Sequence, residues 1–166
     1  MSHPTEADIA ALIRALVEAQ VEFVVVGGAA GVIHGAPITT EDLDIVHRRT
    51  PDNIERLLGL LERLDAFHRY DLANRRLRPT REQLAGTGQL NLSTVLGPLD
   101  PLCELGPGQG YDQLLAHTDV LRDEDLEIRV LTLEKLIEVK AGAGRAKDRL
   151  ALPVLVATLQ ERDQDD

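Results

Sequence analysis

The stretch Phe23-Val24-Val25-Val26-Gly27-Gly28, followed by Asp42-Leu43-Asp44, decides the fold of this 166-residue chain. Four consecutive apolar residues are typical of a short buried strand, and the two glycines end that strand in a tight corner. A brief helix is expected over residues 29–34, and a second strand over residues 43–47. The predicted sheet therefore starts with two strands that are connected by a short helix.

Helical and extended patterns alternate along the rest of the chain. Apolar residues recur at helical spacing in 9–16 and again in 54–64, where Thr50-Pro51-Asp52 marks the helix start. Segments 90–95 and 99–105 predict a hairpin. This alternation predicts an α/β (α+β) fold with a small mixed sheet flanked by helices. The remaining expected elements are a helix over 111–117, strands near 120 and over 128–131, a helix after Thr132 and a last helix over 148–159.

The composition fits a single domain with an aliphatic core. Apolar residues make up 43% of the chain but aromatic residues only 2%, so Leu, Val, Ile and Ala must fill the interior. We expect one domain over residues 1–162 and an acidic tail over 163–166. The single cysteine, Cys103, excludes an intramolecular disulfide and leaves too few thiols for a structural zinc site.

The charge and the hydropathy pattern restrict the partners. With 18 basic and 28 acidic residues, the net charge of −10 argues against a broad basic face for duplex DNA. The first residues form no basic leader, and no apolar run approaches the roughly 20 residues of a membrane span. We therefore expect a cytoplasmic protein with neither a membrane nor duplex DNA as partner.

Asp42 and Asp44 are candidate metal ligands. Residues i and i+2 of a strand point to the same side, so the two carboxylates project together. Two like charges this close raise the pKa of one of them unless a cation lies between them. A small set of hard oxygen ligands suits Mg²⁺ or Mn²⁺ that also contacts phosphates.

Gly27 and Gly28 are the candidate phosphate-binding corner. A glycine turn between a strand and a helix lets backbone N–H groups approach a phosphate closely. Two other phosphate motifs are absent: Ala29 stands where G-x-G-x-x-G needs its second glycine, and no G-K-[ST] occurs. Taken singly, the glycines would be a tight turn and the aspartates a solvated strand face, but their ordered combination predicts a metal–triphosphate site.

Gly27-Gly28, Asp42-Leu43-Asp44 and a later acid on a strand resemble the signature of the polymerase-β-like nucleotidyltransferase superfamily. Segment 96–100 is similar to the hairpin that carries the third carboxylate of that superfamily. Segment 131–148 resembles the C-terminal part of its small bacterial members, the AbiEii/MenT toxin-like and minimal nucleotidyltransferases. The similarity extends over about residues 20–150.

The resemblance implies an enzyme that moves a nucleoside monophosphate from an NTP to a hydroxyl. It implies that Asp42, Asp44 and Asp100 are the catalytic residues and hold Mg²⁺ or Mn²⁺, and that Asp100 accepts the proton of the attacking hydroxyl. Pro101 departs from the family pattern because proline removes a ladder donor, so Glu104 is the alternative third carboxylate.

The resemblance also implies that Gly27 and Gly28 cradle the β- and γ-phosphates of the NTP. Lys140 and Arg145 are the candidates for neutralising phosphate charge. The alternative for this pair is an ordinary solvated turn at the end of a helix.

The candidate acceptor surface is the arginine segment, residues 69–81. Its five arginines and one acid, Asp71, give a local charge of +4 in a chain of net charge −10. It could position the phosphates of an RNA acceptor such as a tRNA 3′ end, or it could be a solvated loop or face an acidic protein. A protein hydroxyl and an aminoglycoside-like small molecule are further possible acceptors. A catalytically silent nucleotidyltransferase fold that binds a cognate toxin or antitoxin protein is the alternative to an enzyme. The five arginines are Arg69, Arg75, Arg76, Arg78 and Arg81.

Overall fold

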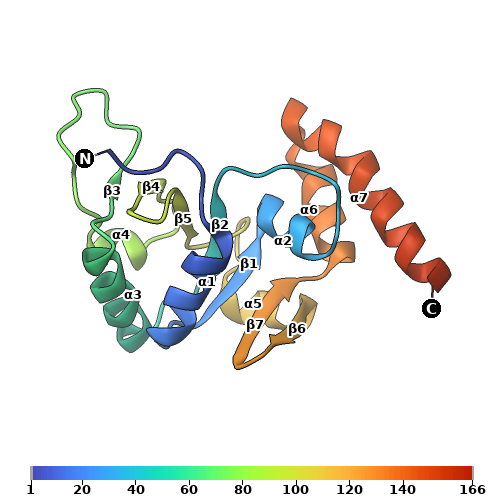
Figure 1. The fold of residues 1–166 in the computed structure, drawn as a ribbon, viewed down its shortest axis with the longest axis horizontal. Coiled ribbons are helices and arrows are strands. Elements are labelled where there is room, and N and C mark those ends of the chain that lie inside the picture. Colours follow the sequence, from blue (N-terminus) through green and yellow to red (C-terminus); the bar gives the residue numbers. More distant parts are fainter. Residues whose placement is uncertain (1, 166) are drawn as a thin grey trace.

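The computed structural model describes residues 2–165 and confirms a mixed α/β fold (Figure 1). The strands are β1 (Phe23–Val26), β2 (Leu43–His47), β3 (Phe67–His68), β4 (Leu92–Ser93), β5 (Leu99–Leu102), β6 (Thr118–Asp123) and β7 (Leu126–Leu131). The helices are α1 (Ile9–Glu18), α2 (Gly27–Ile33), α3 (Pro51–Arg63), α4 (Arg81–Leu84), α5 (Tyr111–Leu114), the 3-10 turn η1 (Leu115–His117), α6 (Leu133–Ala143) and α7 (Ala146–Asp165).

Within the described residues the strands form one seven-stranded sheet in the order β3-β4-β5-β2-β1-β7-β6. β2 pairs antiparallel with β1 and parallel with β5. The register places Asp44 opposite Val26 on one side and opposite Asp100 on the other. The C-terminal end of β1 and the N-terminal ends of β2 and β5 therefore meet on one side of the sheet's interior strands. Asp44 and Asp100 lie at these strand ends, and Asp42 and Gly27 lie directly beside them.

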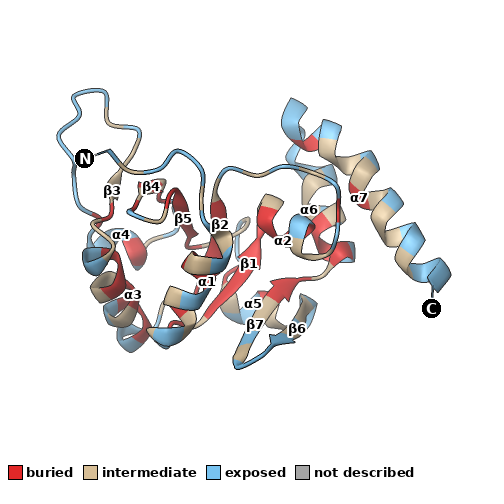
Figure 2. Cartoon of the chain, viewed as in Figure 1, coloured by how far each residue is buried: buried red, intermediate tan, exposed pale blue. Residues whose placement is uncertain are grey.

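The core is aliphatic, as the composition predicts. All four residues of β1 are buried, and α1 and α3 contact each other and place leucines inside (Figure 2). α2 packs against β1, β2 and α6, which keeps the glycine corner close to the C-terminal helices. α7 is largely half-buried or exposed, and Asp148 and Leu155 are its buried residues.

Several element boundaries differ from those the sequence predicts. α2 begins at Gly27 rather than at residue 29, and the hairpin strands shorten to β4 and β5. α7 continues through Asp165, so residues 163–165 are helical where an acidic tail is predicted, and Asp166 lies outside the described residues. Arg162 forms an ion pair with Glu134 of α6, and this pair holds the C-terminal part of α7 against α6. Over residues 2–165, none of the helices is both long and apolar enough to span a membrane.

Candidate active site

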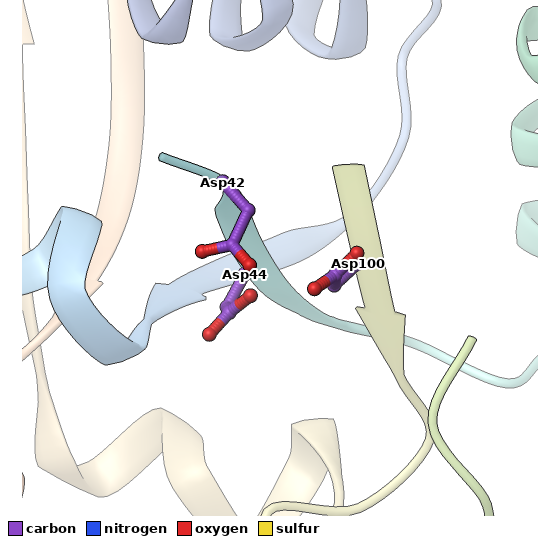
Figure 3. Close-up of side chains that lie close together, drawn as sticks. All are labelled: Asp42, Asp44 and Asp100. Atoms are coloured by element: carbon purple, nitrogen blue, oxygen red, sulfur yellow. The ribbon is translucent and has the colours of Figure 1, made fainter. Parts of the chain in front are cut away.

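Three carboxylates lie together at the N-terminal ends of β2 and β5. Asp42 directly precedes β2, Asp44 lies in β2, and Asp100 lies in the adjacent parallel strand β5. One oxygen from each lies within 4.8 Å of the others (Figure 3). The structure thus brings together the three residues predicted as metal ligands, and their catalytic roles stay predictions.

Pro101 does not remove Asp100 from this cluster. The N–H and C=O of one strand residue point to the same side, and the Pro101 carbonyl accepts a hydrogen bond from the Leu90 N–H at 2.9 Å. The missing donor therefore faces the irregular segment before β4, and Asp100 keeps its place beside β2. Glu104, the alternative third carboxylate, instead accepts a hydrogen bond from Arg49 at 3.3 Å.

Asp44 lies in an environment that disfavours its charge. Burial, followed by the nearby charges of Asp42 and Asp100, raises the pKa of Asp44 to about 7. Its Oδ1 is buried and accepts no hydrogen bond from the described residues. A divalent cation beside Asp44 would offset the unfavourable negative charge and would also give the buried Oδ1 a partner. The donor set is all oxygen, so these residues fit Mg²⁺ or Mn²⁺.

The glycine corner has no room for side chains. Gly27 has a φ of +64°, and a Cβ built on it would lie 2.5 Å from Asp44 Oδ2. A Cβ on Gly28 would lie 2.9 Å from Thr40 Oγ1. The two glycines therefore let the side chains of Asp44 and Thr40 lie directly against the backbone of the corner.

A cavity of about 750 Å³ is lined by the glycine corner, by the three carboxylates and by the C-terminal cations Lys140, Arg145 and Lys147. Ile38, Leu136 and Leu155 give it an apolar wall beside these charged groups. Such a cavity matches a ligand with an apolar part and an anionic part. Its lining includes all seven predicted site residues: Gly27, Gly28, Asp42, Asp44, Asp100, Lys140 and Arg145.

Lys140 and Arg145 share one acidic partner. Lys140 Nζ donates to Asp148 Oδ1 at 2.8 Å, and Arg145 Nε donates to Asp148 Oδ2 at 2.7 Å. Asp148 is fully buried; burial raises its pKa, but the two cations together hold it below its ordinary value. Lys147 lines the same cavity and has no carboxylate partner among residues 2–165. Sequence reasoning missed the shared acid, although Arg145 and Asp148 have the i, i+3 spacing of a helical ion pair.

Arg69 is a residue of the candidate site that sequence reasoning did not separate from its neighbours. Its Nη1 and Nη2 donate to Asp100 Oδ1 and Oδ2 at 2.6 and 3.0 Å, and Nη2 also reaches Asp42 Oδ2 at 3.4 Å. Burial opposes the charge of Arg69, but the hydrogen bonds and charge of Asp100 hold its pKa above the ordinary value. A fixed cation therefore touches two of the three carboxylates.

The other arginines of the segment are mostly neutralised. Arg75 pairs with Asp71 at 3.2 Å and Arg78 with Asp65 at 2.6 Å, and Arg81 forms an ion pair with Glu55. Arg76 alone has no carboxylate partner among the described residues, and its guanidinium lies 5.2 Å from the centre of the Phe67 ring. The segment therefore presents much less free positive charge than its sequence suggests.

The overall fold resembles that of solved nucleotidyltransferases. The lincosamide antibiotic adenylyltransferase LnuA, in its lincomycin-bound crystal structure, matches 93% of this chain and 99% of its own with 12% identity and a TM-score of 0.63. A candidate nucleotidyltransferase from Thermotoga maritima matches 99% of this chain and 98% of its own with 14% identity and a TM-score of 0.56. The chain has a nucleotidyltransferase fold. No family model matches the chain, and no curated protein matches its sequence. The narrower AbiEii/MenT assignment stays a prediction.

Proposed function

We propose that this protein is a metal-dependent nucleotidyltransferase that moves a nucleoside monophosphate from an NTP to a hydroxyl. The observation that carries the proposal is the cluster of Asp42, Asp44 and Asp100 within 4.8 Å in the cavity that also contains the glycine corner. The buried, unpartnered Oδ1 of Asp44 supports a cation at this point. The nucleotidyltransferase fold adds support at the level of architecture.

Each group in the cavity has a role in this reaction. Asp42, Asp44 and Asp100 would hold Mg²⁺ or Mn²⁺, which would offset charge on the triphosphate and on the leaving pyrophosphate. The backbone at Gly27 and Gly28 would contact the terminal phosphates. The acceptor oxygen bonds to the α-phosphorus as the bond to pyrophosphate breaks. Asp100 would accept the hydroxyl proton.

The C-terminal cations would bind the phosphates of the NTP. Lys140 and Arg145 are held at the cavity wall by Asp148, and Lys147 adds a charge that no described carboxylate neutralises. Local positive charge is needed here because the chain as a whole carries a net charge of −10.

A small hydroxylated molecule is the acceptor that the geometry favours. A second cavity of about 440 Å³ shares Asp42, Arg69 and Tyr70 with the first, so an acceptor there would lie next to the carboxylates. This volume suits a small molecule better than a folded macromolecule. LnuA, of similar fold, is described as acting on a lincosamide antibiotic.

The paired arginines count against an RNA acceptor, because each has its own carboxylate partner that offsets its charge, whereas Lys140 and Arg145 share one acid and keep a net positive charge. A tRNA 3′ end rests on the charge of the arginine segment, and a toxin–antitoxin partner rests on the family resemblance. The intact trio of carboxylates argues against the catalytically silent alternative.

Label transfer tests the proposal. The protein is incubated with Mn²⁺ or Mg²⁺ and NTPs labelled at the α-phosphate, together with separate RNA, protein and small-molecule fractions of a cell extract. We expect label in the small-molecule fraction, lost in Asp100→Ala and retained in the matched control Glu104→Ala. Label in RNA or protein would replace the proposed acceptor class. Failure of the wild type both to transfer label and to bind Mg²⁺–NTP would support the silent alternative.

A further inference from the structure

Arg69 is held between two of the proposed metal ligands. Its guanidinium makes a two-pronged contact with Asp100 at 2.6 and 3.0 Å and reaches Asp42 at 3.4 Å. Nη1 also donates to the Leu92 carbonyl at 2.9 Å, and the Arg69 backbone N–H donates to the Asn91 carbonyl at 3.0 Å. The arginine is therefore fixed from the side of β4 and aimed at the carboxylates.

The contact with Arg69 fixes the orientation of the Asp100 carboxylate. Its side chain is 3% exposed and that of Arg69 is 17% exposed, so water competes weakly for either partner. A two-pronged arginine contact uses one lone pair on each carboxylate oxygen and fixes the carboxylate plane. Any cation that binds Asp100 must therefore share it with a fixed positive charge.

We infer that Arg69 is a positioning residue that orients Asp100 and stands in for a second metal ion, so that the three carboxylates hold one divalent ion. The inference rests on the proposed metal site and adds to it the number of ions. The same guanidinium lines both cavities, which places it at the boundary between the proposed donor and acceptor sites.

Electrostatics supports this assignment over a purely structural ion pair. Arg69 approaches Asp42 as well as Asp100 and so lies within the cluster of proposed metal ligands. A unit charge a few ångströms from a divalent ion strongly weakens binding of that ion, even at the effective dielectric constant of about 20 that suits partly buried sites. Removing the charge should therefore strengthen metal binding by about tenfold or more.

Titration with Mn²⁺ as the probe tests the inference. Calorimetry gives the affinity and the number of ions bound by the wild type, Arg69→Gln and Arg69→Lys. Glutamine keeps a hydrogen-bond donor for Asp100 but not the charge, and lysine keeps the charge. We expect one ion in the wild type, about tenfold tighter binding or a second ion in Arg69→Gln, and near wild-type behaviour in Arg69→Lys.

Arg75→Gln is the matched control, because Arg75 belongs to the same segment but pairs with Asp71. Circular dichroism checks the fold of each variant, and Arg69→Ala repeats the test if Arg69→Gln does not fold. Wild-type affinity and a single ion in a folded Arg69→Gln would overturn the inference and leave the proposed metal site intact. No Mn²⁺ binding in either protein would overturn both. Binding by Arg69→Gln alone would contradict a one-ion site in the wild type and would also overturn the inference.

Discussion

Gly27 lies directly against Asp44, because Val26 and Asp44 are register partners on β1 and β2. The turn that leaves β1 gives Gly27 a φ of +64°, and any Cβ there would lie 2.5 Å from Asp44 Oδ2. The space for the Asp44 carboxylate thus exists only because residue 27 has no side chain. The glycine corner and the proposed metal ligand Asp44 are therefore one unit, and a change in the first should alter the second.

Gly27→Ala should lower both stability and metal affinity. The left-handed backbone costs a residue with a Cβ roughly 1–2 kcal/mol, and the collision displaces the Asp44 carboxylate. We expect Mn²⁺ affinity to fall by about tenfold or more, equivalent to about 1.4 kcal/mol. Gly108→Ala is the matched control, because Gly108 has a φ of +74° with nothing within 4 Å of its Cβ position. Equal effects of the two variants on Mn²⁺ binding would contradict the coupling of corner and carboxylate.

Asp44→Asn should stabilise the protein in a pH-dependent way. The folded-state pKa of about 7 lies above the ordinary value of 3.8, so from about pH 4 to 7 the unfolded chain releases this proton while the folded protein retains it. Wild-type stability therefore falls across this window, and the full loss persists above pH 7. The Tm of Asp44→Asn should exceed that of the wild type by little near pH 4 and by most above pH 7.

Thermal denaturation in a chelator between pH 4 and 8 measures this difference. Saturating Mn²⁺ at pH 8 should reverse the order, because the ion stabilises the wild type and the variant has lost a ligand. A Tm difference that stays constant with pH would mean that Asp44 is not the group in the disfavoured environment.

Lys147→Ala should weaken NTP binding without affecting the fold. Lys147 is exposed and has no carboxylate partner within residues 2–165, so its removal should change stability by less than about 0.5 kcal/mol. A charge-assisted hydrogen bond contributes about 1.5–3 kcal/mol, which predicts a roughly tenfold or larger rise in the Kd for Mg²⁺–NTP. Arg149→Ala is the control, since Arg149 lies on α7 and donates to the Gly144 carbonyl at 3.2 Å. Equal NTP affinities in the two variants would remove Lys147 from the site.

The local parts of the site could be predicted from the sequence. Gly27, Gly28, Asp42 and Asp44 lie in and beside two strands, where the period of 2 fixes which side chains share a face. Asp100 needed in addition the resemblance of segment 96–100 to a hairpin of the superfamily, and the antiparallel pairing of β4 with β5 agrees with that hairpin. The inference about Asp42 and Asp44 uses regular backbone geometry, which a sequence pattern specifies well.

Arg69 could not be predicted because no regular pattern determines its direction. It lies in the irregular chain after β3, and its partners Asp42 and Asp100 are 27 and 31 residues away. Nothing in the order of the five arginines distinguishes the one that turns inward. Pairing of the others with acids such as Asp65 also depends on tertiary contacts, so a count of local charge overestimated the free basic surface.

The arginine segment gives the sharpest test between acceptor classes. If Arg75, Arg76 and Arg78 bound RNA phosphates, replacing all three with alanine would lower the slope of log affinity against log salt by roughly 2–3, at about 0.7–0.9 for each contact. Two of the three already contact carboxylates, so we expect the slope for a single-stranded tRNA 3′-end oligonucleotide to fall by less than about 1. Affinity for Mg²⁺–NTP should stay unchanged.

Stability should change little in the triple variant, because exposed ion pairs contribute about 0–1 kcal/mol each. A fall in slope of 2–3 would mean that the arginines exchange carboxylates for phosphates when RNA arrives, and RNA would then replace the small molecule as the proposed acceptor. A loss of Mg²⁺–NTP affinity would instead mean that the segment folds over the donor cavity. The small change in slope that we expect, less than about 1, follows from Asp71 and Asp65, which neutralise Arg75 and Arg78 and leave Arg76 as the one arginine of the three without a carboxylate partner among the described residues.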